Sequence, residues 1–153
     1  MRVEIAAASF DPHKALAAFS APHAEAGALA SFVGYCRAHS NGKAVERLEL
    51  EHYPGLTESE IARIAAAIAA KHGLLDLLVI HRVGAIAAGE AIVLAAAVSA
   101  QRAAAFAAVE ELMDALKTDA PIWKREIGPD GARWIEPTPQ DHARRAAHEE
   151  KSR

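Results

Sequence analysis

The sequence predicts a single α+β domain in which helices pack against a mixed or antiparallel sheet. Its length of 153 residues fits one domain that buries a core. Strand-like and helix-like segments follow one another in an irregular order, which is typical of α+β proteins rather than of repeated strand–helix–strand units. The chain contains no internal repeat and no linker between domains.

Hydrophobic patterns locate the elements along the chain. The predicted strands cover residues 3–5, 28–37, 45–53, 74–82, 90–99, 122–127 and 133–135. The predicted helices cover residues 11–19, 57–72 and 100–118. We expect residues 1–136 to form the domain and residues 137–153 to form a polar C-terminal tail, whose composition also allows a frayed helix.

Cap and turn signals define the first half of the chain. Asp11 is a suitable N-cap and Pro12 suits the first position of a helix, so the first helix begins there. Asn41-Gly42 is a strong turn signal between two predicted strands. We therefore expect residues 28–37 and 45–53 to pair in antiparallel fashion. The connecting loop carries Arg37, His39 and Lys43.

Similar signals frame the two long helices. Thr57-Glu58-Ser59-Glu60 forms a capping box before the second helix, and His72-Gly73 ends that helix. Residues 84–89 are predicted to be a loop between two strands. The apolar face of the third helix is formed by Phe106, Val109, Met113 and Leu116. Pro121 ends this helix, and Gly128-Pro129-Asp130-Gly131 predicts the turn of a closing hairpin.

The composition excludes several classes of protein. A formal net charge of −3 gives no global basic surface for nucleic acid. The single cysteine, Cys36, excludes a disulfide framework within the chain and fits a reducing cytoplasm. No stretch reaches the length of a membrane span, and Glu4 interrupts the segment where a signal peptide would continue its apolar core. We therefore expect a cytoplasmic protein that binds neither nucleic acid nor membranes.

The sequence offers no motif for a metal or a cofactor. Its eight histidines include no HxH or HExxH pair, and a single thiol cannot build a cysteine-rich site. The GxSxG, P-loop and GxGxxG patterns are also absent. We expect neither a bound metal nor a cofactor.

The segment from Lys117 to Glu126 is the most informative part of the chain. It sets lysines, an arginine and a tryptophan around Pro121. An amine that is crowded by other cations and partly dried loses some preference for its proton, and it can then act as a base or nucleophile. The alternative is a helix end with solvated charges followed by a surface strand. The residues taken alone favour this alternative, because charge runs are usually solvated.

Other polar residues allow two interpretations each. Arg102 begins a helix whose first turn has no acid, which suits a bound phosphate as well as a solvated arginine. Arg37 ends an apolar strand, where it would contact a phosphate or, more commonly, guard a strand edge. Cys36 fits a small buried hydrophobe better than an activated thiolate. His81-Arg82 is as compatible with a structural role as with a functional one.

Several motifs together give a more specific indication. They are Phe32-Val33-Gly34-Tyr35-Cys36-Arg37-Ala38-His39, Leu50-Glu51-His52-Tyr53-Pro54-Gly55-Leu56-Thr57-Glu58, Val79-Ile80-His81-Arg82-Val83-Gly84, Ser99-Ala100-Gln101-Arg102, Lys117 to Glu126, and Arg133-Trp134-Ile135-Glu136. On these motifs the chain resembles the catalytic (large) subunit of molybdopterin synthase from about residue 28 to residue 136. The run Lys-Thr-x-Ala-Pro-x-Trp-Lys-Arg-Glu is especially specific.

This resemblance implies an α+β fold of the α/β hammerhead type and a cytoplasmic sulfurtransferase of molybdenum cofactor biosynthesis. Such an enzyme converts cyclic pyranopterin monophosphate into molybdopterin. The sulfur arrives as a thiocarboxylate on the C-terminal Gly-Gly tail of a small ubiquitin-like partner, and the assembly is a heterotetramer with a central dimer of large subunits. Because the chain ends in Lys151-Ser152-Arg153, we expect it to need this partner rather than to carry the sulfur itself.

The resemblance also assigns residues to a site. Lys117 and Lys124 match catalytic lysines, and Lys117 is expected near the partner's terminal thiocarboxylate. Arg37 and Arg102 match substrate-binding positions. The remaining substrate-binding residues on this basis are Tyr35, Cys36, Gln101, Arg125 and Glu126.

Two positions depart from the family pattern. Gln101 stands where the family usually has His, and Gln can donate a hydrogen bond to a phosphate but cannot shuttle a proton near neutral pH. A basic residue that reaches the neighbouring subunit's pocket in some relatives is replaced around Pro137-Thr138-Pro139, with Arg144 or Arg145 as available substitutes. Gln101 leaves an alternative function open, namely a non-catalytic relative that binds the partner and a phosphate ligand with reduced or lost turnover.

Overall fold

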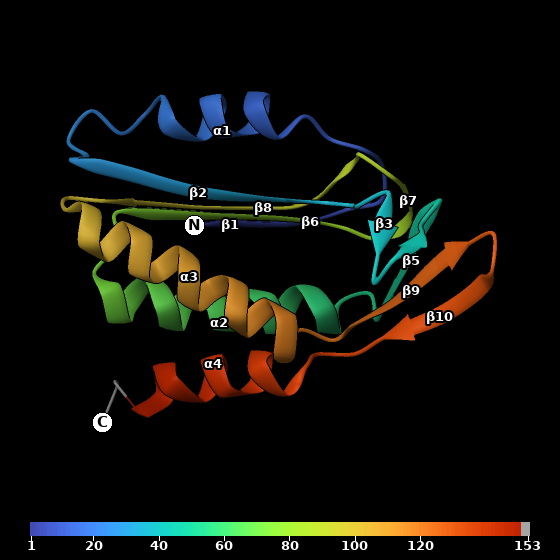
Figure 1. The fold of residues 1–153 in the computed structure, drawn as a ribbon. Coiled ribbons are helices and arrows are strands. Elements are labelled where there is room, and N and C mark those ends of the chain that lie inside the picture. The colour runs from blue at the N-terminus through green and yellow to red at the C-terminus, as the bar shows by residue number, and fades with distance from the viewer. Residues whose placement is uncertain (151–153) are drawn as a thin grey trace.

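The computed structural model describes residues 1–150 and contains two four-stranded sheets, a small two-stranded hairpin and helices on both faces of the first sheet (Figure 1). The strands are β1 (Arg2–Ala6), β2 (Ala28–Tyr35), β3 (His39–Ser40), β4 (Lys43–Ala44), β5 (Arg47–His52), β6 (Asp76–Arg82), β7 (Gly84–Ala87), β8 (Ala91–Ser99), β9 (Ile122–Gly128) and β10 (Gly131–Ile135). The helices are α1 (Pro12–Ser20), α2 (Leu56–His72), α3 (Arg102–Thr118) and α4 (Pro139–Glu150). None of the helices in residues 1–150 is long and apolar enough to cross a membrane.

The first sheet has the strand order β1-β6-β8-β2. β1 runs parallel to β6, whereas the β6–β8 and β8–β2 pairs are antiparallel. α1 covers one face of this sheet, α2 and α3 cover the other, and α4 lies on the outer side of α3 (Figure 1). The prediction of an α+β fold with a mixed sheet is therefore confirmed.

The central strand β6 shows how this arrangement buries the core. Side chains alternate between the faces of a strand, so Leu77 and Val79 pack with the α2–α3 layer while Leu78 and Ile80 pack with α1. All four are fully or almost fully buried. Burial of each such side chain stabilises the fold by about 1.5–3 kcal/mol.

The second sheet has the order β10-β9-β5-β7 and lies beyond one end of the first sheet (Figure 1). Its inner face packs on a small apolar cluster of Cys36, Val45, Leu50 and Ile86. The hairpin of β9 and β10 matches the prediction for residues 122–135. This sheet matters for the site because β9 carries Lys124.

The predicted pairing of residues 28–37 with residues 45–53 is wrong. β2 pairs with β8, whereas β5 lies in the second sheet between β9 and β7. The Asn41-Gly42 turn does form, with positive φ angles of 50° and 76°, but it joins only the two-residue strands β3 and β4. The turn signal was satisfied locally, and the flanking strands diverge into different sheets.

Two further boundaries differ from the prediction. Residues 84–87 form β7 rather than a loop, because they complete the second sheet against β5. α2 begins at Leu56 with Gly55 as its N-cap, two residues before the cap predicted at Thr57, and the Glu58 carboxylate accepts a hydrogen bond of 2.6 Å from the Gly55 N–H.

The apolar face predicted for α3 is confirmed at Val109 and Leu116, which are buried, and at Met113, which packs against the core, but not at Phe106. Phe106 is 67% exposed, while Ala105, Ala108 and Leu112 are buried. Alanines on the inner face let the helix axis approach the alanine-rich β8 closely, so the bulky Phe106 is left outside. Within the predicted tail, residues 139–150 form α4, and residues 151–153 lie outside the described residues. The division between a domain of residues 1–136 and a tail remains a prediction.

Thr57 gives a test of this architecture. Its buried hydroxyl accepts a hydrogen bond from the Tyr53 N–H (3.0 Å) and donates one to the Pro121 carbonyl (3.1 Å), so it joins the ends of β5 and α2 to the segment before β9. Thr57→Val should leave both backbone groups unpaired and lower the free energy of unfolding by about 1–3 kcal/mol in urea titrations. Ser59→Ala, at an exposed position of the same helix, is the control. Equal stabilities of the two variants would contradict this role.

Candidate functional site

The site forms where α3 ends and β9 begins. Lys117 lies in the last turn of α3, where the negative end of the helix dipole favours a cation. Lys124 lies on β9 opposite Leu50 and Ile135, and strand alternation directs its side chain to the inner face of the second sheet. Pro121 follows the end of α3 and separates the two elements. A short connection thus brings two ammonium groups to the same place.

Both lysines line two adjoining cavities. The outer cavity has a volume of about 440 Å³ and is also lined by Trp123, Ile135 and His142. The inner cavity has a volume of about 310 Å³, and its other lining residues include Phe32, Tyr35, His81, Met113 and Arg144. We keep the names outer and inner for these two cavities, and the lysines stand at the boundary between them, where they can contact ligands in both.

Lys117 is held by a carboxylate from α4. Its Nζ lies 2.9 Å from Oδ1 of Asp141, whose side chain is 5% exposed although that of Lys117 is 51% exposed. Oδ2 of Asp141 accepts hydrogen bonds of 2.8 Å from both the N–H and the hydroxyl of Thr138. Burial acts to raise the pKa of Asp141, but these bonds and the Lys117 charge outweigh it and lower the pKa to about 2. Asp141 thus caps α4 with one carboxylate oxygen and holds the Lys117 ammonium with the other.

Lys124 has a different environment. Burial, together with the nearby charge of Lys117, lowers its pKa below the ordinary value for a lysine, and the Asp141 carboxylate opposes this shift only in part. A lysine that releases its proton more readily can serve as a base or nucleophile. The two amines are therefore not equivalent, since Lys117 has a carboxylate partner and Lys124 is desolvated.

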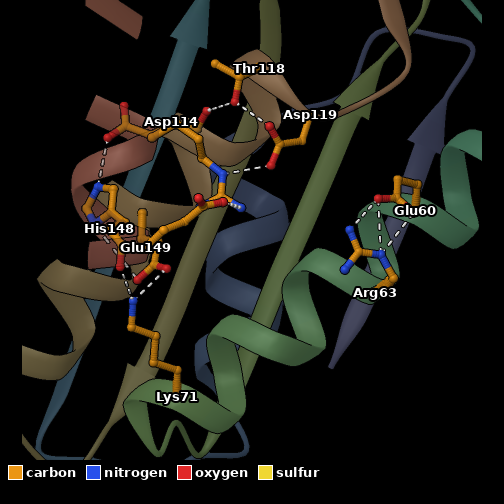
Figure 2. Close-up of polar contacts among 10 residues, drawn as sticks. Glu60, Arg63, Lys71, Asp114, Thr118, Asp119, His148 and Glu149 are labelled. Atoms are coloured by element: carbon orange, nitrogen blue, oxygen red, sulfur yellow. Dashed lines mark hydrogen bonds and ion pairs between the residues drawn. The ribbon is translucent and has the colours of Figure 1, made fainter. Parts of the chain in front are cut away.

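Polar contacts fix α4 against α2 and α3 (Figure 2). Figure 2 shows His148 of α4 meeting Asp114 of α3, with Nε2 2.9 Å from Oδ2. The Lys71 ammonium of α2 donates to the His148 carbonyl at 3.1 Å and to buried Glu111 at 2.9 Å. Arg145 adds an ion pair of 2.7 Å with Asp119, directly after α3. These contacts hold the helix that supplies Asp141.

The residues around the end of β2 divide between the cavity and the core. Tyr35 is exposed and lines the inner cavity, and its role in substrate binding remains a prediction. Cys36 is only 2% exposed and packs with Val45, Leu50 and Ile86, so its thiol does not line either cavity. Burial raises the pKa of this thiol, which agrees with the interpretation of Cys36 as a small buried hydrophobic residue rather than an activated thiolate. Arg37 is exposed and follows directly, at the same end of the first sheet.

Arg125 and Glu126 lie on opposite faces of β9. Arg125 points to the outer face, where it pairs with Glu49 and stacks 5.4 Å from the Trp134 ring centre. The placement of Arg125 in one pocket with Lys124 was wrong for a single chain, because neighbouring residues of a strand face opposite ways. Glu126 shares the Lys124 face but is buried in an ion pair of 2.6 Å with Arg133.

Gln101 and Arg102 lie far from the lysines in the same chain. Both are exposed at the N-terminus of α3, and Lys117 is near its C-terminus, which separates them by about 22 Å along the helix. The β2–β8 register gives the same result, because Ala28 lies opposite Ser99 while Tyr35 lies opposite Ala91. One chain therefore does not bring Arg102 together with Arg37 and Lys117.

The sequence reasoning missed Asp141 and left His81 unresolved. Thr138-Pro139-Gln140-Asp141 is a capping-box pattern with proline at the first helical position, so the sequence did contain a signal for Asp141. Its pairing with Lys117 depends on how α4 folds back and has no local signal. Within residues 1–150, no group of three or more His, Cys, Asp or Glu side chains is arranged to hold a metal ion.

Asp141 predicts a pH-dependent contribution to stability. Its pKa in the folded protein is about 2, below the ordinary 3.8, so its contribution is present above pH 4 and is lost as the pH falls toward 2. Asp141→Asn should lower the free energy of unfolding by about 2 kcal/mol at pH 7, and the difference from the native protein should shrink between pH 4 and pH 2. Asp130→Asn, in an exposed turn, is the control. A difference that is independent of pH would contradict the ion pair.

Comparisons with known proteins agree with this architecture. The profile of the MoaE protein family matches residues 5–119. The molybdopterin synthase catalytic subunit of Caulobacter vibrioides is 48% identical over 132 residues, which cover 86% of this chain and 87% of that protein. The subunit of the same name from Pseudomonas aeruginosa is 43% identical over 143 residues, covering 94% and 95% of the two chains.

Solved structures with a similar fold come from the same group of proteins. The molybdopterin biosynthesis MoaE protein from Burkholderia ambifaria superposes with a TM-score of 0.77 at 40% identity, covering 93% of this chain and 95% of that one. Molybdopterin synthase from Staphylococcus aureus superposes with a TM-score of 0.79 at 29% identity, covering 88% and 96%. The family profile and the close relatives each span most of the chain, and the chain belongs to the MoaE protein family.

Proposed function

We propose that this chain is the catalytic subunit of a molybdopterin synthase. In this proposal it transfers sulfur from the C-terminal thiocarboxylate of a small ubiquitin-like partner to cyclic pyranopterin monophosphate, and it works in the cytoplasm. The observation that carries the proposal is the pair of unlike lysines, Lys117 and Lys124, at the boundary of two cavities. The names of the close relatives support the same assignment.

We assign a different ligand to each of the two cavities. The partner's tail would enter the outer cavity, and the ammonium of Lys117 would hold its terminal thiocarboxylate. A sulfur lone pair would then attack a side-chain carbon of the substrate in the inner cavity and form the C–S bond, while the bond between that carbon and an oxygen of the cyclic phosphate breaks and the oxygen leaves with the electron pair on the opened phosphate. Water would cleave the resulting thioester, which leaves a carboxylate on the partner and the sulfur on the substrate. Lys124, with its lowered pKa, would give and take the proton in these steps.

The phosphate-binding residues require a second copy of the chain. Gln101 makes no capping hydrogen bond with its side chain, and the first turn of α3 contains no acid, so N–H groups and the Arg102 guanidinium remain available to an anion. Because this end of α3 is far from Lys117 in one chain, we propose that Gln101 and Arg102 of one subunit complete the site of the other. Gln101 would bind the phosphate rather than move a proton.

Reconstitution tests the activity. The purified protein, mixed with thiocarboxylated partner and cyclic pyranopterin monophosphate, should form molybdopterin. Lys117→Ala should abolish product without preventing partner binding in a pull-down, because the fold around an exposed helix end is retained. A native protein that binds the partner but forms no product would instead support the non-catalytic alternative.

Mixed dimers test the shared site. Lys117→Ala and Arg102→Ala should each be inactive alone, because both sites of each dimer lack one residue. After dissociation and reassociation of a 1:1 mixture, half of the dimers contain both variants and one intact site each, so activity should recover to about a quarter of the native value. Recovery would not occur if Arg102 and Lys117 of the same chain formed the site, and an absence of recovery contradicts the proposal.

A further inference from the structure

His81 is a buried histidine in the inner cavity that the proposed mechanism does not use. It lies near the end of β6, the second strand of the first sheet, and is only 3% exposed. By strand alternation it faces the same side as Leu77 and Val79, which is the side covered by α2 and α3. There it lines the inner cavity together with Tyr35, Lys117 and Lys124.

The hydrogen bonds of His81 define which nitrogen is free. Nδ1 lies 2.8 Å from the Arg82 carbonyl, and a carbonyl oxygen only accepts, so Nδ1 carries the proton. Burial and the charge of Lys124 lower the pKa of His81 to about 4, which keeps the ring neutral near pH 7. Nε2 is then a hydrogen-bond acceptor. Among residues 1–150, Nε2 has no hydrogen-bond partner.

The backbone at the corner between β6 and β7 holds the His81 ring in this orientation. The buried Arg82 guanidinium donates to the Val83 carbonyl at 3.1 Å and to the Ala85 carbonyl at 2.8 Å, which fixes the corner between β6 and β7. The carbonyl that accepts the hydrogen bond from His81 Nδ1 therefore belongs to Arg82, whose own side chain is anchored to the corner. The imidazole is therefore held as one tautomer.

Apart from His81, the charged side chains that line the inner cavity are mainly hydrogen-bond donors. Lys117 and Arg144 can only donate hydrogen bonds, Lys124 donates while it is protonated, and the Tyr35 hydroxyl can donate or accept. The carboxylate of Asp114 is occupied by His148. A ligand that fills the cavity and brings only acceptors would leave the buried His81 nitrogen unpaired, and an unpaired buried acceptor is unfavourable.

We propose that His81 is a specificity residue whose Nε2 accepts a hydrogen bond from a ring N–H or hydroxyl of the substrate in the inner cavity. This inference rests on the proposed function, and it names the residue that recognises a donor group of the pyranopterin. Together with the lysines, His81 would select a ligand that carries donors and acceptors on the same ring edge. A ligand with acceptors alone would be bound less well.

Equilibrium binding tests this role without turnover. The complex is assembled with partner that ends in an ordinary carboxylate, and the Kd of cyclic pyranopterin monophosphate is measured by calorimetry. His81→Phe keeps a planar ring but removes the acceptor, and it should raise the Kd about tenfold. His81→Gln restores an acceptor and should recover part of the loss. His13→Phe, at an exposed position on α1, is the control, and thermal midpoints verify folding.

A second measurement needs no variant of uncertain folding. In protein labelled with ¹⁵N-histidine, the resonance of His81 should show a protonated Nδ1 and a bare Nε2, and the Nε2 signal should move toward that of a hydrogen-bonded acceptor when substrate is added. An unchanged Nε2 signal, or equal Kd values for the native and His81→Phe complexes, would overturn the role of His81 alone. A native complex that does not bind the substrate would contradict both this role and the proposed function.

Discussion

The ion pair between Lys117 and Asp141 is the contact on which the rest of the site depends. Two ammonium groups at the boundary of two small cavities repel each other, and the buried Asp141 carboxylate offsets this repulsion. Asp141 can do so only because Thr138 and the contacts of α4 with α3 hold it in place. The C-terminal helix is therefore part of the site and not merely a polar cover.

The same geometry explains why a single chain is insufficient. The first sheet and α3 are both long, and the sequence motifs that suit an anion lie at opposite ends of them. Arg37 follows the end of β2 at which Tyr35 lines the inner cavity, whereas Arg102 follows the opposite end of β8. A dimer that places the start of one α3 beside the lysines of the other chain would join the sulfur-accepting and phosphate-binding parts of the substrate.

Local signals predicted more of the fold than of the site. The α+β class, the long helices and the β9–β10 hairpin follow from periodicity and turn residues, which act over a few positions. The partners of β2 and β5 could not be predicted, because the Asn41-Gly42 turn is compatible with a long hairpin as well as with the short β3–β4 pair. Likewise, nothing near Lys117 in the sequence indicates Asp141, and nothing near His81 indicates a cavity.

The titration of Lys124 reports directly on whether the two lysines are electrostatically coupled. In protein with isotope-labelled lysine side chains, the NMR signal of the Lys124 amine should titrate below the usual range of a lysine. Its pKa should rise in Lys117→Met, because the nearby cation is removed while the Asp141 carboxylate remains. A Lys124 that titrates in the usual range, or one whose pKa does not respond to Lys117→Met, would contradict a site built on two unlike, electrostatically coupled lysines.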